Sequence, residues 1–477
     1  MRLAATLLAI LTLTMGSAFA SGDDCALARW RQTVDQLEQI RAQAQVAGLA
    51  LLVVGPDRVV CVAYRGLADR ASGRAVDSRS WFRVGSISKS FTALGALRMA
   101  EAGQLDLRAP LAGVIGDLAP DNPWAPTHPL NLGQLLQHSA GLADMSGTEF
   151  DYPNQGQLSL VQALAIRPQS RALRWPPGLH TSYSNSGAGL VGLAMERAGG
   201  EPFEALMQTH VLEPLGMVEA SFERSALVGE HLVTGYNTDG HSVIPYWHII
   251  YRPAGGLNLR PAMMAPFLQM LLREGQTDNG SFLSVDSVRL FEDPSQTLSA
   301  HSGLRFGRGM GSYHEQYRGH TLHGHGGDAD GYLAHYAYSR EAGLGYFLVI
   351  NAFQPPTLRR MRARVERQLV AALPKPAYPP AFKLTEAELE ARAGEYAELT
   401  RRFGERGLPG KVRLEARSGR LFSIDADGDR IPMIAVNAHH FRRPWQSVAT
   451  MALIQDADQR WILQGEIGNY GRVAEGE

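Results

Sequence analysis

The sequence is organised around the stretch Phe82-Arg83-Val84-Gly85-Ser86-Ile87-Ser88-Lys89, after which apolar residues recur at helical spacing as far as Gly103. This pattern predicts a buried helix with Ser86 in its first turn. Residues three apart share one face of a helix, so we expect the Lys89 amine to reach the Ser86 hydroxyl. The N-terminus of a helix also favours negative charge, which would stabilise an attacking alkoxide. The stretch therefore indicates a serine nucleophile with a lysine as its base.

Lysine is scarce in this chain, which makes the spacing of Ser86 and Lys89 more informative. The 46 basic residues include only four lysines, and the other three lie far downstream, at positions 375, 383 and 411. An ammonium group can lose its proton when it is desolvated, whereas a guanidinium group effectively cannot. We therefore expect Lys89 to act as a proton acceptor; the alternative is an ordinary lysine on the solvated face of a helix.

A tyrosine stands in a loop rich in glycine and serine, Tyr183-Ser184-Asn185-Ser186-Gly187, ahead of an apolar helical pattern. We expect the Tyr183 hydroxyl to lie close to Ser86 and Lys89, where the ammonium would lower the pKa of the phenol. In that position Tyr183 would take the serine proton and return it to the leaving group. Asn185 is expected to bind a substrate carbonyl or to hold Lys89. The alternative is a capped surface loop in which the tyrosine packs on the outside.

A third segment, His325-Gly326-Gly327-Asp328, precedes a strand-like run at 332–338. Glycines at a strand edge allow a substrate to come close, and a backbone N–H here would complete an oxyanion hole with the N–H of Ser86. Three neighbouring histidines, His320, His323 and His325, raise a metal site as the alternative. Their spacing matches no zinc signature, so we expect no metal.

Periodic patterns predict further elements on both sides of these segments. Apolar runs at 48–55 and 59–63, joined by a Pro-Asp turn, predict a hairpin. The pattern is mostly helical from about 90 to 290, and strand-like runs return at 332–338 and 344–350.

The three segments, in this order, resemble the β-lactamase-related serine hydrolases, a family that includes class C β-lactamases, D,D-peptidases and serine esterases. The resemblance extends from about Ala47 to Asn351, with further matching segments at 135–142, 214–217 and 254–257. It implies an α/β (α+β) catalytic domain of the β-lactamase/transpeptidase-like fold, in which helices flank an antiparallel sheet and an all-helical subdomain is inserted. It also implies an acyl-enzyme at Ser86, with Lys89 and Tyr183 sharing the proton transfers and with no metal or organic cofactor.

One residue departs from the family pattern. His325 stands where these hydrolases commonly carry a lysine, so a permanent cation that would grip a substrate carboxylate is missing at this position. An arginine elsewhere in the fold could take its place. The departure weakens the expectation of β-lactamase activity and favours a peptidase or an esterase, with a β-lactam-type substrate kept as a third option. The alternative to an enzyme is a catalytically weak, penicillin-binding-like sensor or ligand-binding protein with the same fold.

Changes in composition divide the chain into four parts. A positive start, an apolar run and Ala18-Phe19-Ala20 are typical of a signal peptide at 1–20. The hydrolase domain then covers 21–373, and four prolines within 374–380 mark a stiff linker at 374–383. The remainder, 384–477, is a β domain: alternating runs separated by turn pairs predict a small barrel or sheet. Its start, at Gly394 and Tyr396, resembles the lipocalin-like domain appended to some of these hydrolases.

Composition also limits the partners and the location. Lys and Arg number 46 against 47 Asp and Glu, so the net charge of −1 gives no general attraction to nucleic acid. No run after the signal peptide is long and apolar enough to cross a bilayer. We therefore expect an exported protein, in a bacterial periplasm, that acts on a small-molecule or peptide substrate. In that oxidising setting Cys25 and Cys61 would either form one disulfide, which pins an N-terminal helix to a strand, or remain free.

Overall fold

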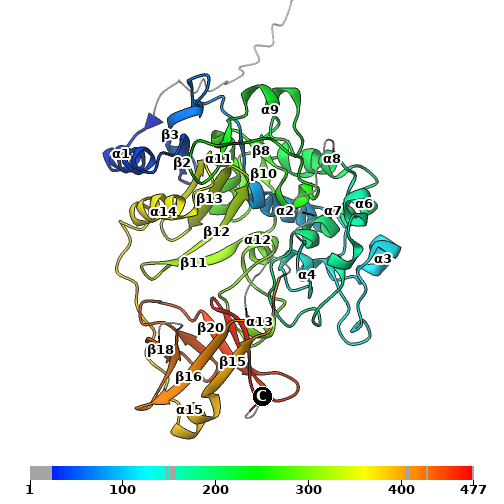
Figure 1. Ribbon diagram of the computed structural model, residues 1–477, viewed down its shortest axis with the longest axis vertical. Coiled ribbons are helices and arrows are strands. Elements are labelled where there is room, and N and C mark those ends of the chain that lie inside the picture. Colours follow the sequence, from blue (N-terminus) through cyan, green and yellow to red (C-terminus); the bar gives the residue numbers. More distant parts are fainter. Residues whose placement is uncertain (1–23, 147–148, 150–156, 403–407, 426–427, 475–477) are drawn as a thin grey trace, which may run out of the picture.

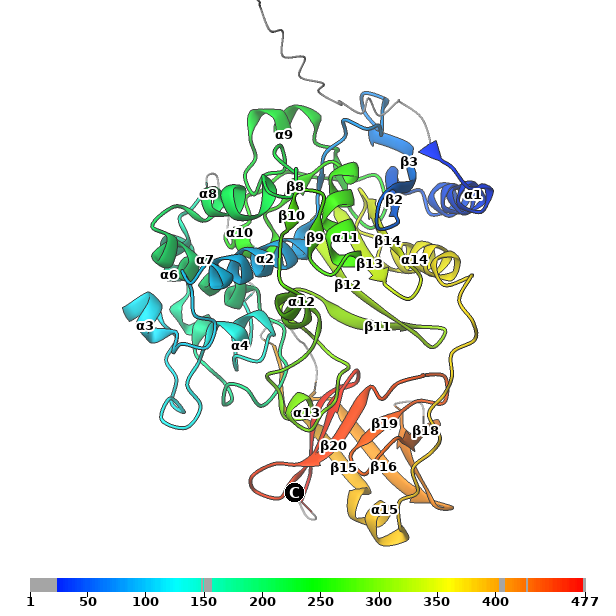
Figure 2. The same cartoon turned by 180° about the vertical axis from the view of Figure 1, so that it is seen from behind.

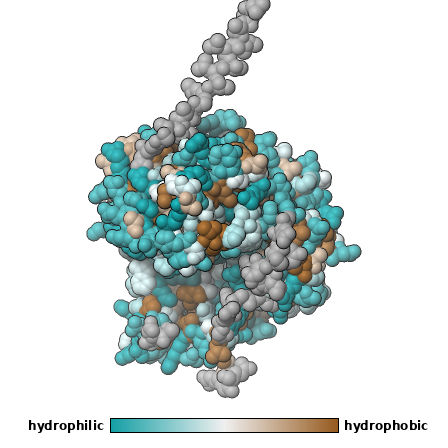
Figure 3. Space-filling view, turned by 45° about the horizontal axis from the view of Figure 1, so that its top comes forward, coloured by the Kyte–Doolittle hydropathy of each residue, from teal (hydrophilic) through white to brown (hydrophobic). Residues whose placement is uncertain are grey.

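The computed structural model describes residues 24–146, 149, 157–402, 408–425 and 428–474, and the predicted signal peptide at 1–20 lies outside them. Two bodies follow one another along the chain: a large sheet with helices, and a small β-barrel below it in the view of Figure 1. The face shown in Figure 3 is mostly hydrophilic, with hydrophobic residues in small scattered groups. Among the described residues, no helix is both long and apolar enough to cross a membrane.

An antiparallel sheet of eight strands forms the centre of the large body, with seven strands in the order β1-β3-β2-β14-β13-β12-β11 and β4 paired to β3. The predicted hairpin is β2 and β3, and its strand β2 also pairs with β14. The bounds of the strands are β1 Asp24–Cys25, β2 Gly48–Val54, β3 Val59–Asp69, β4 Arg74–Ala75, β11 Tyr313–Tyr317, β12 His320–Ala329, β13 Tyr332–Ser339 and β14 Leu344–Ile350.

Helices cover both faces of this sheet (Figures 1 and 2). On one face, α1 (Ala28–Gln43) and α14 (Pro355–Leu369) pack together over Leu49 and Leu51 of β2. On the other face, α11 (Met264–Leu272) packs over Leu52. Because both faces are covered, every residue of β2 is buried, which explains its continuous apolar run.

A helical layer is inserted beside the sheet, around the central helix α2 (Ser88–Glu101). All residues of α2 from Ser88 to Leu97 are buried, because the helix has neighbours on every side. The other helices of eight or more residues here are α7 (Asn185–Gly199) and α12 (Val285–Glu292). The shorter ones in the described residues are α3 Ala112–Ile115, α4 Leu132–Leu136, α6 Leu160–Ala165, α8 Phe203–Met207, α9 Ala226–His231 and α10 Arg252–Gly255, whereas α13 Leu298–His301 packs against the C-terminal barrel.

The C-terminal β domain is a closed barrel of eight strands rather than an open sheet. A short helix, α15 (Glu386–Arg392), precedes it and begins with a capping box at Thr385. The barrel core contains Tyr396 and Phe441, both fully buried. The strands are β15 Gly394–Glu398, β16 Lys411–Arg417, β17 Arg420–Ile424, β18 Arg430–Ala435, β19 His440–Arg442, β20 Met451–Gln455, β21 Trp461–Gly465 and β22 Gly468–Arg472.

The barrel is fixed to the large body through the segment that leads into Tyr183. Gln464 Nε2 donates a hydrogen bond to the Leu179 carbonyl at 2.8 Å. Asn469 Nδ2 donates to the Thr181 carbonyl at 2.7 Å, and the Thr181 N–H donates to Asn469 Oδ1 at 3.3 Å. Tyr183 therefore follows a stretch of backbone that the barrel holds in position.

The two cysteines form a disulfide, which decides between the two alternatives left by the sequence. Cys25 of β1 and Cys61 of β3 are bonded and occupy opposite positions in the ladder of these two strands. Because β1 comes directly before α1, the bond ties the start of the described chain to the sheet edge.

Candidate active site

Ser86 lies in a single 3-10 turn, η1 (Gly85–Ile87), that leads directly into α2. This turn is tighter than the first α-helical turn expected from the sequence, and Gly85 enters it with a left-handed backbone (φ +53°). A β-carbon at Gly85 would lie 2.3 Å from the Asp328 carbonyl oxygen. Glycine therefore allows the turn to pack against the end of β12, which brings Ser86 beside the predicted third segment.

Lys89 lies one helical turn beyond Ser86, and its amine is buried among hydrogen-bond acceptors. Lys89 Nζ is 3.2 Å from Ser86 Oγ, 2.7 Å from Asn185 Oδ1 and 2.8 Å from the Ala254 carbonyl oxygen. The residue as a whole is only 5% exposed. The expected contact between amine and hydroxyl is therefore present, and the solvated alternative for Lys89 is wrong.

The surroundings of Lys89 favour the neutral amine. Burial lowers the pKa of Lys89 to about 7; the Asp144 carboxylate opposes this shift, while Arg402 and Arg308 add to it. A substantial fraction of the amine is consequently unprotonated near neutral pH. In that form it can accept a proton from the hydroxyl beside it.

Tyr183 stands two residues before α7, with its ring centroid 4.8 Å from Lys89 Nζ and 4.3 Å from the ring of His138. Burial raises the pKa of Tyr183 to about 12, and its hydrogen bond with Ser86 opposes this shift only in part. The expected lowering of the phenol pKa is therefore wrong, because the loss of solvation outweighs the nearby cations. At neutral pH Tyr183 is a protonated phenol, which can donate a proton but is a poor acceptor.

Asn185 holds Lys89, which is the second of the two roles expected for it. Its Nδ2 donates to Asp144 Oδ2 at 3.2 Å, and its backbone N–H donates to Asp144 Oδ1 at 2.5 Å. Because Lys89 is a donor and Asp144 an acceptor, the amide oxygen must face the lysine. Sequence reasoning missed Asp144, since one aspartate in a loop forms no motif with Asn185, 41 positions later.

The third segment forms the end of β12. A β-carbon at Gly327 would lie 1.9 Å from the Val84 carbonyl oxygen, and the Gly326 N–H donates to the Tyr313 hydroxyl at 2.8 Å. His325 is buried, and this burial lowers its pKa to about 3. The imidazole is therefore neutral, so this position carries no permanent cation, as the sequence indicates.

Asp328 lies at the far end of the same segment. Asp328 is exposed, but partial desolvation of its carboxyl, together with the neighbouring Asp330 carboxylate, raises its pKa to about 6. The cavity around Ser86 has a volume of about 580 Å³. Seven of the eight predicted site residues line it, and the eighth, Lys89, contacts it through Ser86; the seven are Ser86, Tyr183, Asn185, His325, Gly326, Gly327 and Asp328.

Three arginines that the sequence does not single out also line this cavity, and two of them, Arg308 and Arg402, lie beside Tyr183. The Arg308 guanidinium lies 5.4 Å from the ring centroid of Tyr183 and 4.9 Å from that of Tyr313. Arg402, which follows β15 of the barrel, lies 5.3 Å from the Tyr183 ring and forms an ion pair with Asp144. They put two permanent positive charges beside Tyr183. The sequence allows for an arginine in place of the family lysine, but it carries no signal for which one.

A second cavity, of about 750 Å³, lies between the large body and the barrel. It shares Tyr183, Arg308, Tyr313 and Arg402 with the cavity around Ser86. Its walls are otherwise rich in hydroxyl, amide and charged side chains from both bodies. A polar space therefore continues from Ser86, past Tyr183, toward the barrel.

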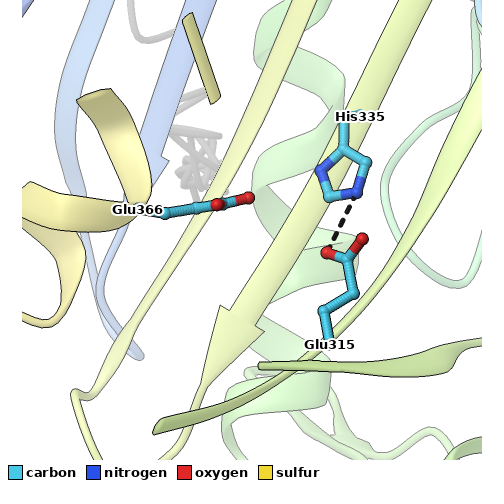
Figure 4. A group of neighbouring side chains, drawn as sticks. All are labelled: Glu315, His335 and Glu366. Atoms are coloured by element: carbon cyan, nitrogen blue, oxygen red, sulfur yellow. Dashed lines mark ion pairs between the residues drawn. The ribbon is translucent and has the colours of Figure 1, made fainter. Parts of the chain in front are cut away.

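A neighbouring cluster, whose His335 also lines the cavity around Ser86, has ligand atoms at metal-like spacing: Glu315 of β11, His335 of β13 and Glu366 of α14 (Figure 4). The Arg362 guanidinium lies 2.7 Å from Glu315 and 3.0 Å from Glu366, so a cation already bridges the two carboxylates. These residues fit an ion-pair network and not a metal centre. Within the described parts of the chain, the three histidines of the metal alternative do not group at ligand spacing.

Comparisons with known proteins identify the family to which this chain is similar. Residues 30–371 match the family model described as Beta-lactamase. A Homo sapiens protein named beta-lactamase-like 1 is 29% identical over 408 residues, 79% of each chain. Penicillin-binding protein 4 of Amycolatopsis lactamdurans is 26% identical over 334 residues, 68% of this chain and 85% of that protein, and an esterase of Burkholderia gladioli also matches.

The solved structure of the penicillin-binding protein homologue from Pyrococcus abyssi superposes on both bodies. The TM-score is 0.60 at 19% identity, over 93% of this chain and 100% of that chain. This likeness confirms the β-lactamase/transpeptidase-like fold expected from the sequence. By its sequence and its fold, the chain belongs to the β-lactamase family.

Proposed function

We propose that this protein is a serine hydrolase that forms an acyl-enzyme at Ser86 and cleaves an amide or ester bond in a peptide or small molecule. The observation that carries the proposal is the 3.2 Å contact between Lys89 Nζ and Ser86 Oγ, made by an amine whose pKa burial lowers to about 7. A hydroxyl with such a base beside it is an activated nucleophile. Membership of a family that contains hydrolases supports the same reaction class.

In acylation, Lys89 accepts the Ser86 proton while Oγ attacks the substrate carbonyl. The backbone N–H groups of Ser86 and Asp328 bind the oxyanion, a role supported by the packing of η1 against the end of β12. Tyr183 donates its proton to the leaving atom as the bond to the carbonyl carbon breaks, and the Lys89 ammonium restores the phenol. Hydrolysis of the acyl-enzyme follows the same path in reverse, with water as the attacking group.

The side of the site that receives the leaving group favours a carboxylate. Tyr183, the proton donor for the leaving atom, faces Arg308 and Arg402, and the polar interdomain cavity starts at these residues. Because His325 is neutral, the arginines supply the positive charge there. A peptide whose released fragment carries a carboxylate fits this arrangement best, and small esters and β-lactam-type compounds are the other substrates to test.

Export belongs to the same proposal, with a signal peptide at 1–20, a hydrolase domain at 21–373, a linker at 374–383 and a β domain at 384–477. The disulfide between Cys25 and Cys61 supports an oxidising location such as a bacterial periplasm.

A fluorophosphonate probe tests the proposal. We expect the probe to label the wild type on the peptide that contains Ser86, as measured by mass spectrometry, and to leave Ser86→Ala unlabelled. Ser72→Ala, at an exposed serine far from the cavity, is the matched control and should be labelled like the wild type. Folded wild-type protein that takes no label would contradict the proposal and point to a non-catalytic sensor. For labelled protein, p-nitrophenyl esters, D-amino-acid peptides and nitrocefin, compared side by side, define the substrate class.

A further inference from the structure

The active-site lysine is linked to the barrel by a chain of polar contacts that the catalytic steps above do not use. Lys89 Nζ donates to Asn185 Oδ1, and Asn185 donates twice to Asp144. Arg402 Nη2 in turn lies 2.5 Å from Asp144 Oδ2. Arg402 follows the first barrel strand, 258 positions after Asp144, so this chain of contacts crosses from the large body to the barrel.

We propose that Asp144 and Arg402 are positioning residues for Lys89: Asp144 fixes the Asn185 amide against the lysine, and the barrel arginine neutralises the buried carboxylate so that Lys89 is free to act as a base. This inference rests on the proposed function, in which Lys89 accepts the serine proton. It makes the barrel a working part of the active site rather than an appended domain.

The first half of the argument concerns the orientation of the Asn185 amide. An asparagine can face a neighbour with its oxygen or with its NH2 group, and only the oxygen accepts from Lys89. Asp144 is an acceptor for the other end of the same amide. With an acceptor on one side and a donor on the other, the amide has one satisfactory orientation, which holds Nζ in reach of Ser86 Oγ.

The second half concerns charge. The Asp144 side chain is 1% exposed, and a buried carboxylate needs a compensating cation. Arg402 supplies that cation directly. Without Arg402 the Asp144 carboxylate would still be linked to Lys89 through the Asn185 amide, and an opposite charge favours the protonated amine. Loss of the arginine would therefore convert the base into a spectator ammonium at neutral pH.

Other groups around Lys89 do not replace this pairing. The titratable or charged side chains that face the lysine in the described structure are Tyr183, His138, His325, Arg308, Asp144 and Arg402. Burial keeps both histidines and the phenol neutral at pH 7. Arg308 is directed at the rings of Tyr183 and Tyr313, so Arg402 is the arginine that forms the ion pair with Asp144.

The lysine content of the chain permits a direct test that does not need turnover. With [6-13C]lysine, full-length protein gives one signal for each of its four lysines, and the signal lost in Lys89→Arg identifies Lys89. Arg402→Gln raises the titration midpoint of Lys89 by about one pH unit. Arg402→Lys, which keeps the charge, leaves the midpoint near the native value.

Removal of the Asp144 carboxylate should shift the Lys89 midpoint in the opposite direction. It provides a second variant in case Arg402→Gln does not fold. Asp144→Asn lowers the midpoint, and the double variant Asp144→Asn/Arg402→Gln loses the rise seen in Arg402→Gln alone. Arg413→Gln, at a largely exposed arginine on β16, is the matched control and leaves the midpoint unchanged. A native midpoint in both Arg402→Gln and Asp144→Asn would overturn the inference.

The pH profile of kcat/KM provides the second readout. In Arg402→Gln the acid limb moves up with the lysine midpoint, so activity falls about fivefold at pH 7 and recovers above about pH 9. An equal loss at every pH would indicate a purely structural role and contradict the inference. Absence of any turnover in the wild type would contradict the proposed function instead. The lysine titration would still show whether Asp144 and Arg402 control the protonation of Lys89.

Discussion

Two buried polar clusters lie close to strands β12 and β13, and similar groups have opposite roles in them. Around Lys89, burial lowers the pKa of the amine to about 7, and a cavity opens at Ser86. Around Glu315, burial alone would raise the carboxyl pKa, but His335 and Arg362 lower it to about 2. The comparison shows that burial does not by itself make a reactive group: a fully paired charge is a structural brace, whereas an amine left without a direct anionic partner becomes a base.

The largest effect is expected when the base is replaced by a permanent cation. Lys89→Arg keeps the charge and most of the volume but removes the proton acceptor, so we expect acylation to slow by roughly a thousandfold. The rate of p-nitrophenyl ester turnover measures this, with thermal unfolding as the control for folding. If Lys89→Arg turned over the ester as fast as the wild type, Lys89 would not be the base, and the contrast between the two clusters would not hold.

Disruption of the ion-pair network around Glu315 should lower the stability of the fold. Arg362→Met leaves Glu315 and Glu366 without their shared cation, and we expect the free energy of unfolding to fall by about 3 kcal/mol. Urea denaturation followed by fluorescence measures the change. Arg359→Met, at an exposed position of the same helix α14, is the matched control and should cost far less. Equal losses in the two variants would show that the buried cluster has no special structural role.

Tyr183→Phe should cost less than Lys89→Arg and should depend on the leaving group. A poor leaving group needs a proton from the phenol, so we expect roughly a hundredfold loss with a peptide. A p-nitrophenolate leaves without one, so the loss with its ester should be much smaller. The ratio of kcat values for the two substrates in both proteins measures this difference, and an equal loss for both would argue against Tyr183 as the proton donor.

The smallest effect is a difference in pH dependence: activity, which depends on Lys89, and stability, which depends on Glu315, should be lost over different pH ranges. The neutral Lys89 amine is the active form, so kcat/KM should fall about tenfold for each pH unit below about 7. The depressed pKa of Glu315 gives a stability contribution that is present above about 4.5 and is lost as pH falls toward about 2. Activity should therefore vanish near pH 5 while the protein stays folded, as judged by circular dichroism. Loss of both over the same pH range would contradict the separation.

Much of the architecture could be predicted from local patterns. The apolar runs on either side of the Pro-Asp turn appear as β2 and β3, and the run at 332–338 appears as β13. These strands can be recognised in the sequence because a strand face that is buried in the fold must carry apolar side chains. The order of the strands could not be predicted from these runs alone, since pairing of β2 with β14 depends on which edges the helices leave open.

The pKa of Tyr183 is the clearest failure of reasoning from the sequence. A neighbouring ammonium was expected to lower it, but burial raises it to about 12. The order of the three segments indicates that Tyr183 lies near Lys89. The desolvation of the Tyr183 ring, by contrast, depends on all that surrounds it, including His138 and the preceding backbone that the barrel holds. The mechanism proposed above therefore gives Tyr183 the role of proton donor, where the sequence predicts a residue that first accepts the serine proton.

The sequence by itself determined the pair at the centre of the site. Ser86 and Lys89 are three residues apart at the start of one helix, and helical geometry brings residues at that spacing together wherever the helix lies. The tertiary structure decided which of its two expected roles Asn185 has, and only the tertiary structure identified Asp144 and Arg402 as further partners. Their contacts join distant positions and two separate bodies, and such contacts arise from packing and burial of the whole chain, for which no short spacing is a guide.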